Sequence, residues 1–219
     1  MNCSQQLSDV TTNYLCRFYK ILDEMIEGMT NAELTNSLSH NFIVQMIPHH
    51  RAAIEMSENL LQYTTFVPLQ RIAQNIVNEQ TKSIENMQSV LPHCAQLSNS
   101  EKDLCLYDRR FRQITQTMFS QMRNACSNNN INANFMREMI PHHQGAIQMS
   151  KNVLQYPSVR NLTLFCKPLL RRRKKGCWRC GVCFDASAVS KSINCLVSSL
   201  VYTSAALCHC QFFCVLLRV

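Results

Sequence analysis

The chain begins with apolar residues that recur every three or four positions, which is the spacing of an amphipathic helix. Between Leu7 and Met29 these apolar side chains fall on one side of a helical wheel, and this predicts a helix with one buried face. A second segment with helical spacing runs to about Tyr63 and can be capped at its start by Ser37 or Ser39.

The second predicted helix contains Pro48, which removes one backbone donor and is expected to bend the helix axis. After a turn-like stretch at 64–68, apolar residues recur over 69–91, and Pro92 is expected to end this third helix. Three successive helices of this kind predict an all-α helical bundle.

The sequence then repeats itself at an offset of 93 positions. The pentapeptide Met-Ile-Pro-His-His occurs at 46–50 and again at 139–143. Aligned without a gap, residues 42–63 and 135–156 are identical at 14 of 22 positions, which chance does not produce. The two segments are therefore copies of one unit.

This repeat defines the domain organisation that we expect. The second copy predicts one helix over 104–122 and another, containing Pro141, that ends near Tyr156. The counterpart of the third helix starts and is then lost near Phe165. We expect a first helical half-repeat over 1–95, a truncated second half-repeat over 96–164, and a tail over 165–219.

Charge separates the tail from the rest of the chain. Residues 1–165 carry 13 basic and 13 acidic side chains, whereas residues 166–219 carry nine basic and one acidic. The formal net charge of +8 therefore comes from the tail. A neutral helical part without a basic stripe lacks the positive surface that nucleic acid requires, so we expect no nucleic-acid partner.

Three interpretations of the tail are open. Its uncharged run at 192–217 follows a basic cluster at 171–175, as in a membrane segment, although polar residues interrupt the run. Cys177, Cys180 and Cys183 have the spacing of zinc or iron–sulfur ligands, but a fourth ligand is not evident. We favour a frameshifted end, which explains both the change in composition and the missing helix.

Cysteines of the helical part also leave alternatives. Cys3 with Cys16 and Cys94 with Cys105 could form two disulfides or two thiol pairs. An odd total of 13 cysteines argues against a simple disulfide framework, and buried free thiols are an equally good interpretation.

Histidine and methionine gather on one half of each pentapeptide helix, at Met46, His49, His50 and Met56 and again at Met139, His142, His143 and Met149. The helix before each copy carries two methionines four positions apart, Met25 with Met29 and Met118 with Met122. Thioether and imidazole together form a soft donor set, which suits Cu(I) or Ag(I) and offers little to Mg²⁺ or Ca²⁺. The alternative is core packing, the usual role of a methionine stripe.

Enzymatic interpretations have less support. A carboxylate-bridged di-iron bundle needs glutamate three positions before a histidine, and none precedes these pairs. Gln45 stands in the first copy where Glu138 stands in the second, and no nucleophile recurs at motif spacing. We expect a non-enzymatic protein.

These residues resemble the bacterial family called domain of unknown function 305 (DUF305). The likeness covers about residues 14–163 and rests on the two pentapeptides, on the Ala-Ile and Met that follow each, and on Gln80, Ile84 and Met87. It implies a ferritin-like bundle of two half-repeats that binds copper or silver outside the cytoplasm, in metal buffering, trafficking or resistance. By position, the implied ligands are Met25, Met29, Met46, His49, His50, Met56 and Met87, with Met118, Met122, Met139, His142, His143 and Met149.

The chain departs from that family in two ways. Residues 1–15 show neither the basic nor the apolar region of a secretory signal peptide, so the expected location outside the cytoplasm has no support in the sequence. Met87 has no counterpart in the second copy. A bundle open on one side would expose apolar surface, and we therefore also expect a homodimer as one arrangement. The rival to metal binding is a structural or interaction bundle without a metal.

Overall fold

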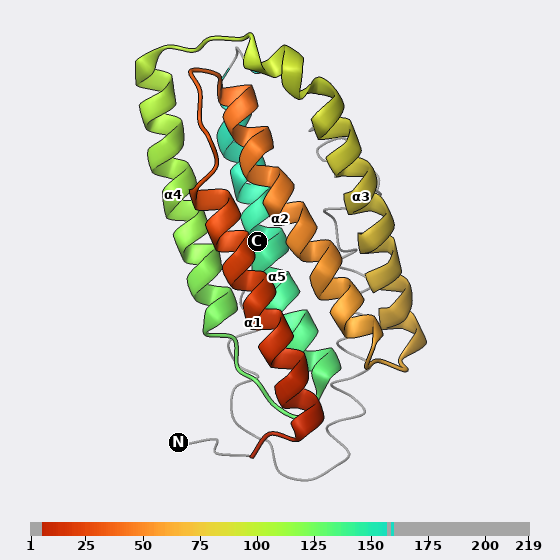
Figure 1. Cartoon of the computed structure of the whole chain (residues 1–219). Coiled ribbons are helices and arrows are strands. Elements are labelled where there is room, and N and C mark those ends of the chain that lie inside the picture. The colour runs from red at the N-terminus through yellow and green to blue at the C-terminus, as the bar shows by residue number, and fades with distance from the viewer. Residues whose placement is uncertain (1–5, 157–158, 160–219) are drawn as a thin grey trace, which may run out of the picture. The chain divides into compact units, whose positions relative to one another are not determined.

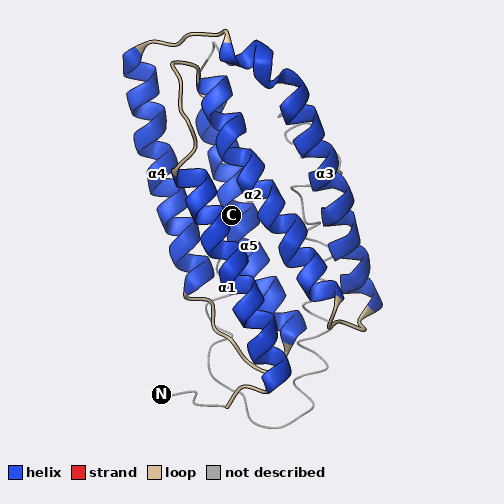
Figure 2. Ribbon diagram, viewed as in Figure 1, coloured by secondary structure: helices blue, strands red, loops and turns tan. Residues whose placement is uncertain are grey.

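The computed structural model describes residues 6–156 and 159, and this part of the chain contains five helices and no strand (Figure 1, Figure 2). The all-α helical bundle predicted from the sequence is confirmed. In chain order the helices are α1 (Asp9–Thr30), α2 (Leu38–Leu61), α3 (Val67–Ala95), α4 (Glu101–Arg123) and α5 (Ile131–Val153).

Helix α2 occupies the middle of the arrangement, where it packs against α1, α3 and α5. Helix α5 packs in turn against α4, and α1 touches α4. Figure 1 shows α1 in red crossing in front of α5, with α3 on the far side of α2 from α4. The two pentapeptides, on α2 and α5, therefore lie on neighbouring helices although they are 93 positions apart.

Short polar side chains begin four of the helices. Ser8, Ser37, Ser100 and Asn130 each accept a hydrogen bond from a backbone N–H in the first turn of the helix that follows. Such caps satisfy N–H groups that have no partner inside the helix, and each contributes about 1 kcal/mol. The structure selects Ser37 from the two caps expected for α2.

The spacing of apolar residues correctly predicted which face of α1 is buried. On α1, for example, Phe18, Leu22 and Met25 are buried with their neighbours at helical spacing. Burying each such side chain stabilises the fold by about 1.5–3 kcal/mol relative to leaving it in water. The core formed in this way lies between α2 and the helices around it.

One predicted boundary is wrong. Helix α3 does not end before Pro92 but continues through it to Ala95. Pro92 sits in the last turn, so its missing N–H removes a single bond near a terminus that frays in any case. Proline inside α2 and α5, at Pro48 and Pro141, was expected and is present.

The cysteine alternatives are partly resolved. Cys16, Cys94 and Cys105 are free thiols, so a disulfide between Cys94 and Cys105 is not formed. Cys94 is buried, in agreement with the buried-thiol interpretation, whereas Cys16, Cys105 and Cys126 are free thiols that are exposed. Cys3 and the tail over 165–219, with its candidate membrane segment and metal ligands, lie outside the described residues.

Candidate functional site

The structure brings the four histidines of the two pentapeptides together where α2 meets α5. The rings of His49 and His142 stack with centroids 3.7 Å apart and planes inclined by 27°. His50 lies 5.9 Å from His49, and His143 lies 5.3 Å from His142, measured between ring centroids. All four are buried, with at most 6% of the side chain exposed.

Reciprocal hydrogen bonds hold the stacked pair. Nε2 of His49 donates to the backbone carbonyl of His142 at 3.3 Å, and Nε2 of His142 donates to the carbonyl of His49 at 3.2 Å. A carbonyl oxygen only accepts, so this geometry requires the proton on Nε2 and leaves a lone pair on Nδ1 of each ring. Both Nδ1 atoms are buried without a hydrogen-bond partner.

The two outer histidines face equivalent carbonyls. Nδ1 of His143 donates to the carbonyl of Met139 at 2.9 Å, one turn earlier on α5, which directs the lone pair to Nε2. The carbonyl of Met46, the counterpart of Met139, acts in the same sense on the pKa of His50, although Nδ1 of His50 makes no hydrogen bond as well formed. The two copies therefore differ here in how closely the ring approaches the carbonyl.

Burial keeps all four imidazoles neutral. Desolvation is the largest cause of the lowered pKa of each, and it brings the pKa of His50 to about 3, helped by His142 and His143. Histidine binds metals only as neutral imidazole. These rings are thus in their ligating protonation state throughout the ordinary pH range.

The methionines predicted as ligands are all buried, each with at most 6% exposed, and they come from every helix of the bundle. Met139 contacts a histidine through its carbonyl. Met118 lies across Gly145 of α5, where an added Cβ would overlap its Sδ and come within 2.8 Å of its Cγ. The first-copy counterpart of Gly145 is Ala52, so Met25 cannot lie across α2 in the same way.

Comparison with protein families gives a match to the model described as Domain of unknown function (DUF305), over residues 21–91 and 40–176. These matches together span more than half of the chain. The chain belongs to the DUF305 family. No curated protein and no solved structure matches it.

Several buried contacts recur in this DUF305 chain at the 93-residue offset. Asn59 donates from Nδ2 to the carbonyl of Tyr14 at 3.1 Å, and Asn152 does the same to Tyr107 at 3.1 Å. Near the start of each pentapeptide helix, one asparagine bonds both the N–H and the carbonyl of the loop residue six positions earlier, Asn41 with Thr35 and Asn134 with Asn128.

One recurring contact, from a tyrosine to the residue at position 138 or 45, differs chemically between the copies and was not predicted from the sequence. Tyr14 donates its hydroxyl to the carboxyl of Glu138 at 2.7 Å, whereas Tyr107 donates to the amide oxygen of Gln45 at 3.3 Å. Burial raises the pKa of Glu138 from 4.5 to about 7, against the opposing effects of Tyr14 and Arg137. Glu138 is thus a buried carboxyl one helical turn before His142.

Two further buried polar atoms have no hydrogen-bond partner, Oγ of Ser57 on α2 and Oε1 of Gln80 on α3. Gln80 is one of the residues on which the family likeness rested. Within residues 6–156, no group of three or more His, Cys, Asp or Glu side chains could hold a metal ion. No helix in the same region is long and apolar enough to cross a bilayer.

Proposed function

We propose that this protein binds a soft monovalent cation, Cu(I) or Ag(I), through imidazole nitrogen and methionine sulfur, and serves in metal buffering, trafficking or resistance. The observation that carries the proposal is that His49 and His142, whose rings stack, each bury an Nδ1 atom without a hydrogen-bond partner. Buried polar atoms normally have a partner, so two unpaired acceptors on one pair of rings call for an explanation.

The hydrogen bonds of these rings agree with a ligand role. A metal-binding histidine commonly donates its second ring N–H to a backbone carbonyl, which fixes both the tautomer and the ring orientation. His49, His142 and His143 each make such a bond to a carbonyl. On His49 and His142, Nδ1 is left without a hydrogen-bond partner and keeps a lone pair for a cation.

The electrostatics favour a cation of low charge. The four imidazoles are neutral, and thioether sulfur carries no charge at any ordinary pH. The cost of bringing an ion into an apolar core rises with the square of its charge, so uncharged donors suit Cu(I) or Ag(I) better than a divalent ion. We assign the remaining ligands to the buried methionines, first to those on α2 and α5.

The contacts that recur at the 93-residue offset also support a ferritin-like arrangement of two half-repeats. Asn59 with Tyr14, and Asn152 with Tyr107, fasten each pentapeptide helix to the helix before it in the same way. In this proposal, His49 and His142 lie where the two half-repeats meet, and each half contributes donors to a shared site.

A structural bundle without a metal is the second candidate, and one observation favours it. The reciprocal bonds between His49 and His142, with their stacked rings, would by themselves fasten α2 to α5. A histidine pair that serves only to hold two helices together needs no bound metal ion.

An anaerobic Cu(I) titration of the full chain against a competing chelator separates the two candidates. Thiols are alkylated first, and circular dichroism checks that the helices are retained. We expect His49→Gln combined with His142→Gln to abolish tight binding, and His40→Gln, at the start of α2 and outside the cluster, to leave it unchanged. Equal binding by all three proteins, with only stability lowered in the double variant, would establish the structural candidate.

A further inference from the structure

A groove of about 460 Å³ lies between α4 and α5. Ile114, Met118, Pro141 and Gly145 give it apolar walls, while threonine and glutamine side chains surround them. Its residues include one cation, Arg110, and no carboxylate. A hard divalent ion would therefore find no anionic ligand here.

Two features connect the groove with the histidine cluster. Met118 lies over the bare backbone of Gly145, because a Cβ at that glycine would overlap the thioether. Pro141, also in the groove wall, immediately precedes His142. The groove is thus lined by a buried sulfur and by the residue that precedes His142 on α5.

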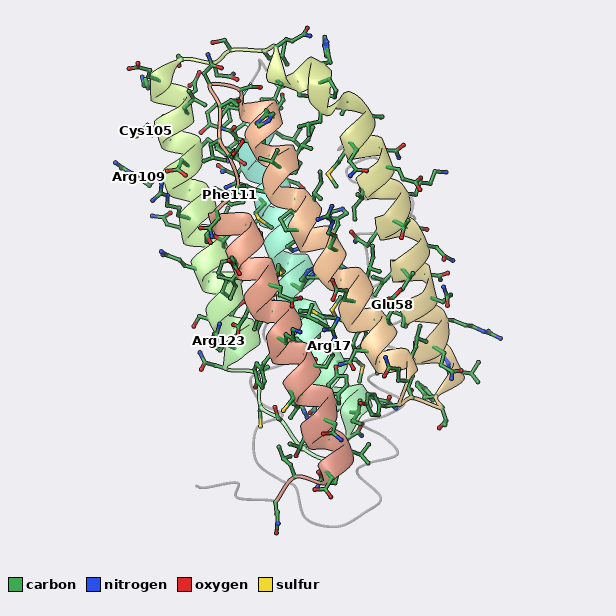
Figure 3. All side chains as sticks on the ribbon, viewed as in Figure 1. Arg17, Glu58, Cys105, Arg109, Phe111 and Arg123 are labelled. Carbon is green, nitrogen blue, oxygen red and sulfur yellow. The ribbon has the colours of Figure 1, made fainter. Side chains whose placement is uncertain are left out.

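The corresponding face of the first copy, between α1 and α2, is closed by two contacts. Gly28 lies so close to Pro48 that an added Cβ would come within 2.8 Å of the proline Cβ. An ion pair of 2.6 Å joins Arg17, labelled in Figure 3, to Glu55 across the two helices.

Neither closing contact has its counterpart in the second copy. Gln121 replaces Gly28 opposite the proline, and Gln148 replaces Glu55. Arg110, the counterpart of Arg17, donates instead to Gln113 on its own helix at 3.3 Å. The α4–α5 face therefore lacks both of the contacts that close the α1–α2 face.

We propose that this groove is the entrance through which the soft cation reaches the buried site, with Met118 as its first sulfur ligand. This inference rests on the proposed function and adds a route and an order of contact. The glutamine and threonine side chains offer neutral oxygens that a hydrated cation can pass without being retained. The thioether below then offers a stronger bond to a soft ion than those oxygens do.

The entrance can be tested without any metal. Hydrogen peroxide transfers one oxygen atom to a thioether sulfur, which gives a sulfoxide and leaves water. Met118 is as deeply buried as its counterpart Met25, so the test follows Met118 itself in three proteins, by mass spectrometry of the peptides. Thr117→Trp, which fills the groove without a change of charge, should slow the oxidation of Met118, whereas Gln116→Trp, outside the groove on the same helix, should not.

The second arm follows Ag(I) uptake by stopped flow. We expect Thr117→Trp to slow uptake about tenfold with the amount bound unchanged, and Gln116→Trp to have no effect. Peroxide reactivity of Met118 that is unchanged by Thr117→Trp, or Ag(I) uptake that is unchanged by it, would overturn the entrance alone. A wild-type protein that takes up no Ag(I) would overturn the proposed function, and the route with it.

Discussion

The two copies of the repeat use the same backbone contacts but differ in what surrounds them. The first copy is enclosed, with α3 packed against α2 and with Gly28 and the Arg17–Glu55 pair closing the α1–α2 face. The second has an open groove between α4 and α5 and a buried carboxyl, Glu138, in place of an amide. The stacked histidines therefore recur in both copies, while the contacts that close the outer face and the charge at position 45 or 138 differ between them.

The largest expected effect is a loss of protein stability at low pH, caused by the four buried histidines. The pKa of each of the four histidines is lowered in the folded protein, so below about pH 6.5 the unfolded chain binds protons that the folded chain does not. The contribution of the histidines to stability is therefore complete above that pH and is lost as pH falls, by at most about 1.4 kcal/mol per pH unit for each histidine.

Urea unfolding between pH 7 and pH 4 measures this loss. Replacing His49 and His50 with glutamine should reduce this pH dependence, and replacing His142 and His143 should reduce it as well. If the dependence is the same in both double variants and in the wild type, groups outside the cluster are responsible.

The buried carboxyl should give the next largest effect, with the opposite sign. Because burial raises the pKa of Glu138 from 4.5 to about 7, the folded state binds more protons than the unfolded state between these values. Its contribution makes the protein less stable as pH rises through that window, by about 3 kcal/mol in all.

Glu138→Gln makes the second copy like the first and should remove this contribution, so that the variant exceeds the wild type in stability at pH 8. Gln45→Glu makes the first copy like the second and should lower stability at pH 8. Unfolding curves at pH 4.5 and pH 8 measure both. A Glu138→Gln variant no more stable than the wild type at pH 8 would show that Glu138 is ionised at little cost.

The helix contact at Gly28 should give the smallest effect. Gly28→Ala places a Cβ against the rigid ring of Pro48, and the overlap should outweigh the gain in helix propensity by about 1 kcal/mol. Gln121→Ala at the equivalent exposed position should change stability by no more than about 0.5 kcal/mol. Equal effects in urea unfolding would mean that the two faces are closed to the same extent.

Local rules predicted most of the helices. The spacing of Phe18, Leu22 and Met25 gave the buried face of α1, and Ser37 began α2 where a cap was expected. The predicted end of α3 at Pro92 was wrong because the effect of a proline depends on its place in the helix. In the last turn, Pro92 removes only one backbone hydrogen bond.

The site was predicted only as a set of residues. A helical wheel places His49 and His142 on the inner faces of their own helices, but it does not fix the rotation of one helix against another. The stacking and the exchanged carbonyl bonds depend on that rotation. The groove depends on Gly145 and on a missing ion pair, and both become informative only once α4 and α5 are known to be neighbours.

X-ray absorption at the copper edge tests the central claim most directly. The full chain, with its thiols alkylated, is loaded with Cu(I) and compared with the variant carrying His49→Gln and His142→Gln. We predict a first shell of imidazole nitrogen and thioether sulfur in the wild type, and loss of the nitrogen shell together with most of the bound copper in the variant. An identical copper environment in both proteins would contradict a site built on the stacked histidines.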